Sequence, residues 1–251
     1  MPFVLDLDGV IWLADDPIPG SAEAVARLRA AGEAVVFCTN NSCDPVGEVE
    51  AKLARHGIPA RGDVLTSAMA AASLVEPGER VLVCGGAGVV EALTARGAVP
   101  VRDGDADAVM VGFHRDFDYE RLRIACAAVR RGARLLATND DSSYPTPAGL
   151  IPGGGAILAA VVTGAGVPAI VAGKPNAPMA TLVLDRLGQE GTMVGDRADT
   201  DGRFARALGY RFALVLTGVA TGYEGMDPAP DLVAPDLATL VDGLWHQSPR
   251  T

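Results

Sequence analysis

Two aspartates stand in a short apolar run near the start of this chain. The run Phe3 to Leu7 is predicted to be a strand; Asp6 lies in it, and Asp8 directly follows it. Side chains at i and i+2 share one face of a strand and lie about 6 to 7 Å apart, too far to share a proton. One carboxylate can then attack a substrate while the other protonates the leaving group. Taken alone, such a pair more often accepts hydrogen bonds from turn amides.

Two further polar clusters also follow apolar runs. Thr39 and Asn40 come directly after the run Ala34 to Cys38, and a hydroxyl followed by backbone amides can hold phosphoryl oxygens. Lys174 follows the run Ile170 to Ala172 and offers a compact cation that offsets negative charge. Each has a simpler explanation, as turn chemistry or as a solvated lysine.

A fourth polar cluster follows the run Met193 to Val194. Asp196 is followed by Asp199 and Asp201, and this density of carboxylates suits a hard cation with oxygen ligands, such as Mg2+. The alternative is a helix N-terminus with an acidic first turn. The joint pattern of four polar clusters, each after an apolar run, predicts a single site.

The elements that position these clusters alternate between strands and helices. This order predicts an α/β fold with a Rossmann-like parallel sheet, in which ligands bind at the carboxyl ends of the strands. Predicted strands cover 3–7, 34–38, 81–84, the region of 99, 108–111, 135–137, 170–172, 193–194 and 212–216. Three predicted helices begin at Ser21 as N-cap, at Asp44 as N-cap with Pro45 at N1, and at Thr66. Four more cover 89–96, 119–131, 178–187 and 237–245.

The order Asp-x-Asp, Thr, Lys, Asp resembles the four motifs of the haloacid dehalogenase (HAD) superfamily. Three segments also resemble its nitrophenyl phosphatase and glycerol-phosphate phosphatase branch: Thr39 to Ser42, Ile151 to Gly153 and Leu216 to Val219. The long interval between Thr39 and Lys174 has room for that branch's large α/β cap. The resemblance therefore implies a core domain of residues 1–78 and 169–251 and an inserted cap of residues 79–168.

The resemblance implies a phosphatase mechanism. Asp6 would be the nucleophile that forms an aspartyl phosphate, and Asp8 would act first as acid and then as base. Thr39, the Asn40 amide and Lys174 would hold the phosphoryl oxygens.

The resemblance also implies a magnesium site. Mg2+ would be held by Asp6, the main-chain carbonyl of Asp8 and Asp196. Asp201 would orient metal-bound waters or Lys174 from outside this set.

Substrate choice is expected from the cap loop that holds Asn139, Asp140 and Tyr144. No Lys or Arg occurs between Asn139 and Gly173, so a second anionic group on the substrate would lack a partner there. This favours glycerol phosphate or a similar neutral-headed monoester. His114 and Arg115 would weaken the argument if they faced the site.

Composition limits the partners and the location. Lys plus Arg number 21 and Asp plus Glu 31, and the net charge of −10 argues against general binding of nucleic acid or an anionic membrane. The uncharged stretch 142–173 is broken by glycines and prolines, so no membrane span is expected. The cysteine spacing signals neither zinc nor disulfides, and the N-terminus does not resemble a secretory signal. A cytoplasmic enzyme with a small phosphorylated metabolite as substrate is predicted, and relatives imply a homodimer through the cap.

Three alternatives remain at this point. The glycine turn after Val81 to Cys84, with Asp103 downstream, superficially resembles a dinucleotide fingerprint, but it lacks the third glycine. A non-catalytic metabolite-binding protein could share the fold, although such proteins usually lose Asp6 or Asp8. A phosphotransferase of the same family would use an acceptor other than water.

Overall fold

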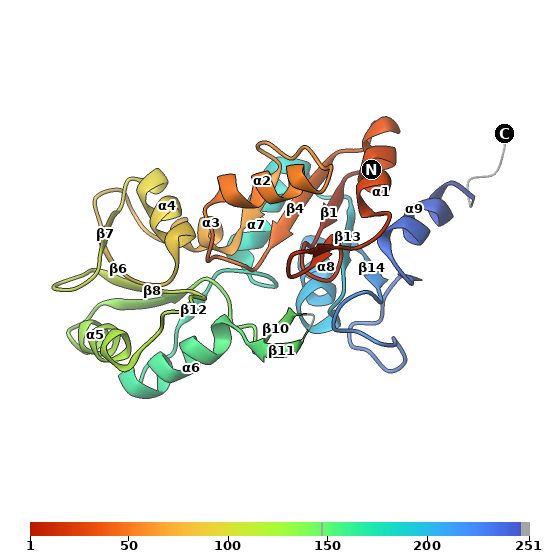
Figure 1. Cartoon of the computed structure of the whole chain (residues 1–251). Coiled ribbons are helices and arrows are strands. Elements are labelled where there is room, and N and C mark those ends of the chain that lie inside the picture. Colours follow the sequence, from red (N-terminus) through yellow and green to blue (C-terminus); the bar gives the residue numbers. More distant parts are fainter. Residues whose placement is uncertain (147, 247–251) are drawn as a thin grey trace.

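The computed structural model describes residues 1–146 and 148–246. Its two large sheets each consist of parallel strands and lie side by side (Figure 1). The larger sheet has six strands in the order β15-β14-β13-β1-β4-β5. Its strands are β1 (Phe3–Leu5), β4 (Val35–Thr39), β5 (Val64–Thr66), β13 (Thr192–Gly195), β14 (Arg211–Val215) and β15 (Leu232–Ala234). All of its neighbouring strands are parallel, which confirms the predicted α/β class.

Helices cover both faces of this sheet, because its central strands are apolar on both sides. Phe3 and Leu5 of β1 pack on the face covered by α1 (Ser21–Ala30), α2 (Val46–Arg55) and α9 (Leu237–His246). Val4 points to the opposite face, which is covered by α3 (Ser67–Ala72), α7 (Ala177–Leu187) and α8 (Arg203–Leu208). The carboxyl ends of β1, β4 and β13 therefore meet at one edge, where their polar residues gather.

The second sheet has five parallel strands in the order β12-β9-β8-β6-β7. Its strands are β6 (Arg80–Cys84), β7 (Val99–Val101), β8 (Ala108–Val111), β9 (Arg134–Ala137) and β12 (Ile170–Val171). Helices α5 (Tyr119–Arg130) and α6 (Gly154–Ala165) cover one face, and α4 (Ala87–Arg96) covers the other. We call residues 80–171 the second lobe and the remainder the main lobe.

One predicted strand lies in a different sheet from the one expected. Ile170 and Val171 pair with Leu136 and Ala137 of β9, so β12 belongs to the second sheet and not to the main one. The predicted boundary at 168 was therefore too early. The apolar sequence of such a short strand does not reveal its pairing partner, which is set by tertiary contacts.

The two lobes share one apolar cluster. It contains Val4 and Val36 of the main sheet as well as Met110 and Leu136 of the second sheet. Helix α3 of the main lobe packs against α4 of the second lobe, and both contribute buried residues to this cluster. The lobes are thus joined by packed side chains in addition to the chain connections.

A β-hairpin lies where the sequence predicted a loop. Strands β10 (Ser143–Thr146) and β11 (Gly149–Pro152) pair antiparallel, and Figure 1 places this hairpin between the two lobes. Two shorter strands, β2 (Trp12–Leu13) and β3 (Asp16–Pro17), also pair antiparallel, directly after β1. Both pairs lie close to the edge where the polar residues gather.

Two helix N-caps differ from the prediction. Gly20, with φ 81°, occupies the N-cap of α1, and Ser21 is inside the helix, where its hydroxyl donates to the carbonyl of Val10. Pro45 occupies the N-cap of α2, one residue after the expected Asp44. Within residues 1–146 and 148–246, every helix is too short or too polar to span a lipid bilayer.

Candidate functional site

A buried ion triad forms the centre of the polar edge. Lys174 Nζ lies 2.9 Å from Asp6 Oδ1 and 2.7 Å from Asp201 Oδ1. Asp6 directly follows β1, whereas Asp201 lies in the π-helical turn Ala198–Gly202 after β13. All three side chains are buried. The structure therefore brings together three positions that the sequence analysis took from separate motifs.

Charge pairing keeps Lys174 protonated. Burial acts to lower the pKa of Lys174, but Asp201 and Asp6 outweigh it and raise that pKa well above its ordinary value. Burial also raises the pKa of Asp6, opposed by Lys174, and raises the pKa of Asp201 to about 6, again opposed by Lys174. One ammonium thus compensates a group of carboxylates that burial would otherwise make costly.

Carboxylate oxygens of Asp6, Asp196 and Asp201 lie within 4.8 Å of one another. Asp201 uses one oxygen for Lys174 and the other for the backbone N–H of Arg197, at 3.3 Å. Burial and the neighbouring carboxylates raise the pKa of Asp196 well above its ordinary value, so this group is short of positive charge. An all-oxygen donor set of this kind fits Mg2+, which prefers carboxylate and water ligands.

The backbone packs tightly around Asp196. Its Oδ2 accepts a hydrogen bond of 2.6 Å from the backbone N–H of Val219. A Cβ atom at Gly9 would lie 2.5 Å from this oxygen, and one at Gly218 would lie 1.9 Å from it. Both positions therefore require glycine, and at Gly9 the backbone φ of +87° requires it as well.

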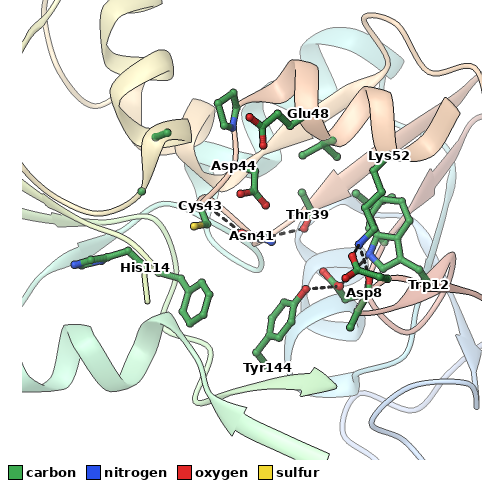
Figure 2. A pocket seen from close by; sticks show the side chains of 18 of the residues that line it. Asp8, Trp12, Thr39, Asn41, Cys43, Asp44, Glu48, Lys52, His114 and Tyr144 are labelled. Carbon is green, nitrogen blue, oxygen red and sulfur yellow. Dashed lines mark hydrogen bonds and ion pairs between the residues drawn. The ribbon is translucent and has the colours of Figure 1, made fainter. Parts of the chain in front are cut away.

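Asp8 is held from both lobes. Its Oδ1 accepts hydrogen bonds from Trp12 Nε1 at 3.0 Å and from the Tyr144 hydroxyl at 2.8 Å (Figure 2). Trp12 belongs to the main lobe, and Tyr144 belongs to hairpin strand β10. Burial raises the pKa of Asp8, while the bond from Tyr144 opposes the shift.

The loop after β4 joins the site to the second lobe. Thr39 Oγ1 accepts a hydrogen bond from Asn41 N–H at 3.0 Å, which leaves the Thr39 hydroxyl proton for another acceptor. The carbonyl of Asn40 accepts a 2.7 Å hydrogen bond from Asn139 Nδ2. Asn139 is buried and holds this loop, a contact that its cap-loop position did not predict.

A cavity of about 800 Å³ opens beside Asp8 and Thr39 and is lined by residues of both lobes. Tyr144 lines it, and Phe113 lies stacked on the Tyr144 ring with the centroids 5.9 Å apart. His114 and Arg115 also line the cavity, although His114 is buried and Figure 2 shows its ring turned away from Asp8.

Asp140, which was expected to meet the substrate, does not reach the site, whereas its neighbour Asp141 does. Asp140 is exposed and does not line the cavity, whereas Asp141 Oδ2 accepts a 2.9 Å hydrogen bond from Asn40 Nδ2. Asp141 was not predicted to be a site residue. The two adjacent acids carried the only available signal, and it did not say which one turns inward.

The fold and the site together define a class of protein. The ends of the parallel strands carry Asp6, Asp8, Thr39 and Asp196. Lys174 reaches the same site from the segment that follows the second lobe. This is the architecture of a HAD-type hydrolase. A profile described as haloacid dehalogenase-like hydrolase matches residues 3–99, and a HAD-hydrolase-like profile matches residues 171–240.

Individual relatives agree with this class. An acid sugar phosphatase from Staphylococcus saprophyticus is 37% identical in an alignment of 231 residues that covers 88% of this chain and 88% of that one. The chain belongs to the HAD-like hydrolase family. A magnesium complex of a glycerol phosphate phosphatase from Mycobacterium tuberculosis superposes with a TM-score of 0.87 at 35% identity, covering 95% of this chain and 75% of that one. A 4-nitrophenylphosphatase from Thermotoga maritima superposes with a TM-score of 0.89 at 32% identity, covering 96% of both chains. Within its family the chain is a phosphomonoesterase.

Proposed function

We propose that this chain is a Mg2+-dependent phosphatase that hydrolyses sugar or polyol phosphomonoesters through an aspartyl phosphate on Asp6. The observation that supports this most directly is the buried Asp6 carboxylate beside Lys174, with Asp8 at the adjoining cavity. The names of the relatives add sugar, glycerol and nitrophenyl phosphates as the chemical classes to test.

The proposed reaction divides one displacement into two. The Asp6 carboxylate attacks phosphorus while Asp8 gives its proton to the departing alcohol oxygen. Asp8 then takes a proton from the water that hydrolyses the aspartyl phosphate. When bound, Mg2+ supplies positive charge that makes attack of one anion on another possible.

The other site residues position the phosphoryl group. The Thr39 hydroxyl, the Asn40 amide and the Lys174 ammonium would hold its oxygens, because positioning and charge compensation dominate phosphoryl transfer. Asp6, the main-chain carbonyl of Asp8 and Asp196 would hold Mg2+. Asp201 would orient Lys174, in agreement with its 2.7 Å ion pair to Nζ.

The charges around the cavity favour an uncharged head group. Its acidic lining residues outnumber its basic ones: the acids are Asp8, Asp15, Asp44, Glu48 and Asp116, and the bases are Lys52, Arg55 and Arg115. Lys52 is already used by the carbonyl of Ala14 and by Asp15. A second phosphate on the substrate would therefore meet a net negative wall, with Arg55 and Arg115 as the remaining cations of the lining. Arg115 weakens the expectation of a neutral head group, which came from the absence of Lys and Arg in the cap loop, but it does not reverse that expectation.

Phosphate release from a panel of esters tests the proposal. The panel contains glycerol phosphate, sugar phosphates, 4-nitrophenyl phosphate and a sugar bisphosphate, each with Mg2+ or with excess EDTA. We expect metal-dependent release and preference for monoesters over the bisphosphate. No release by folded protein with Mg2+ would favour the binding-protein alternative, whereas alcohol release that exceeds phosphate release in the presence of glycerol would favour a phosphotransferase.

Location and assembly are further parts of the proposal. A cytoplasmic location suits the cysteines Cys38, Cys43, Cys84 and Cys126, which are all unpaired. A homodimer through the second lobe stays a prediction, and light scattering of the purified protein measures it directly.

A further inference from the structure

The two oxygens of the Asp8 carboxylate have different surroundings. Oδ1 accepts both of the hydrogen bonds to this side chain, from Trp12 and Tyr144. Oδ2 has no hydrogen-bond partner among residues 1–146 and 148–246. An oxygen that already accepts from an N–H and an O–H is a poor place for a proton, because the proton would face two donors.

We infer that Tyr144 is a positioning residue for acid catalysis, which together with Trp12 fixes Asp8 so that its transferable proton is carried on Oδ2. This inference rests on the proposed function. In the step concerned, the bond from phosphorus to the ester oxygen breaks and its electron pair goes to that oxygen. The Asp8 Oδ2–H bond breaks at the same time and the proton moves to the same oxygen, while Asp6 gains the phosphoryl group.

Tyr144 is itself held in place by the second lobe. Its backbone pairs with Ile151 in the β10–β11 hairpin, and its ring stacks on Phe113 with an interplanar angle of 10°. The phenol thus reaches Asp8 from a segment that does not belong to the main lobe. Trp12 is supported independently, since Lys52 Nζ lies 4.3 Å from the centroid of its ring.

The hydrogen bond from Tyr144 therefore ties the acid to the placement of the second lobe. With the Tyr144 and Trp12 hydrogen bonds in place, the Asp8 carboxyl group is held in a single orientation, in which Oδ2 accepts no hydrogen bond from the described residues. Without the Tyr144 hydroxyl, only Trp12 remains and the carboxyl group can rotate. Misplacement of a reacting group by small distances costs rate without removing any group from the site.

Tyr144→Phe removes the hydroxyl and keeps the ring that stacks on Phe113. The informative substrates are substituted phenyl phosphates of similar shape whose phenols differ in acidity, together with glycerol phosphate. An acidic phenol leaves without a proton, whereas an alcohol needs one. We expect kcat/KM to fall on the order of 10- to 100-fold for glycerol phosphate and less than about 3-fold for 4-nitrophenyl phosphate.

A control variant and a double variant separate this positioning role from substrate binding and from a general structural role. Tyr119→Phe removes a phenol from a side chain that is 80% exposed, and it should leave all substrates unaffected. In an Asp8→Asn background, Tyr144→Phe should have no further effect on 4-nitrophenyl phosphate. Trp12→Phe should reproduce the dependence on the leaving group.

Several outcomes would overturn the inference. Equal losses for all leaving groups would mean that Tyr144 contacts the substrate or only supports the hairpin, and unchanged kinetics would mean that its hydroxyl has no role. Either result leaves wild-type turnover intact and so differs from a failure of the proposed function, in which the wild-type protein itself releases no phosphate.

Discussion

The side-chain amide of Asn40 binds both backbone polar groups of Lys174. Asn40 Oδ1 accepts a hydrogen bond from Lys174 N–H at 2.8 Å, and Asn40 Nδ2 donates to the Lys174 carbonyl at 3.1 Å. The same Nδ2 donates to Asp141. A residue at the end of β4 thereby fixes the position of the ammonium that neutralises Asp6.

We expect Asn40→Ala to lower kcat on the order of 10- to 100-fold, because Lys174 would lose its backbone support. The free energy of unfolding should fall by about 1 to 3 kcal/mol, since buried partners are left without hydrogen bonds. Steady-state kinetics and urea unfolding measure the two effects. A stability loss with unchanged kcat would show that Lys174 keeps its place without Asn40.

Asp6→Asn should abolish turnover, with a loss on the order of 10⁴-fold or more, because an amide cannot form the aspartyl phosphate. The fold should persist, since an Asn oxygen can still accept the 2.8 Å hydrogen bond from Leu7 N–H. Phosphate release and circular dichroism test the two statements. Asp185→Asn, at an exposed position, is the matched control. Normal activity in folded Asp6→Asn protein would refute the proposed nucleophile.

Gly218→Ala should remove the response to Mg2+. The added Cβ would lie 1.9 Å from Asp196 Oδ2, so this carboxylate would have to move. The measurement is the increase in melting temperature on adding Mg2+, which we expect in the wild type and not in the variant. Gly222→Ala is the control from the same loop, because a Cβ there meets nothing within 4 Å. Equal Mg2+ stabilisation in both variants would exclude Asp196 from the metal site.

The metal-free protein should become more stable as the pH falls from 7 to about 5. Burial raises the pKa of Asp201 to about 6, so between its ordinary pKa and pH 6 the folded state holds a proton more tightly than the unfolded state. The same direction holds for Asp6 and Asp196. Lys174 stays charged throughout this window, because its pKa is raised.

Urea unfolding in EDTA at several pH values measures this slope, and the gain should be on the order of 1 kcal/mol or more. Asp201→Asn should flatten it, while Asp103→Asn, at an exposed position, should not. Stability that instead falls steadily from pH 7 to pH 5 in the wild type would contradict the raised pKa values.

The sequence predicted the fold class and most core strands, because apolar runs alternate there with helical patterns. It did not predict the β10–β11 hairpin, whose residues Ser143–Thr146 include a proline and lack a β-branched alternation. Nor did it predict that β12 joins the second sheet, since pairing depends on contacts distant in the chain. The roles of the motif residues remain predictions for the experiments above.

Local patterns also do not report what a side chain contacts across the fold. Asn40 was expected to act through its backbone amide, and the sequence did not indicate that its side chain also holds Lys174. Tyr144 was expected to meet the substrate, and the sequence did not indicate that its hydroxyl also binds Asp8. Both contacts join residues more than a hundred positions apart, and no spacing rule covers such distances.

The apolar cluster that runs from Val4 through α3 and α4 to Met110 limits how new substrate specificities can be built on this chain. A recombined enzyme that takes residues 80–171 from a relative would bring a foreign surface against the buried alanines of α3. Such a chimaera must carry α3 with its donor segment or rematch that surface. Single substitutions around the cavity are therefore the easier route by which this enzyme could acquire another substrate.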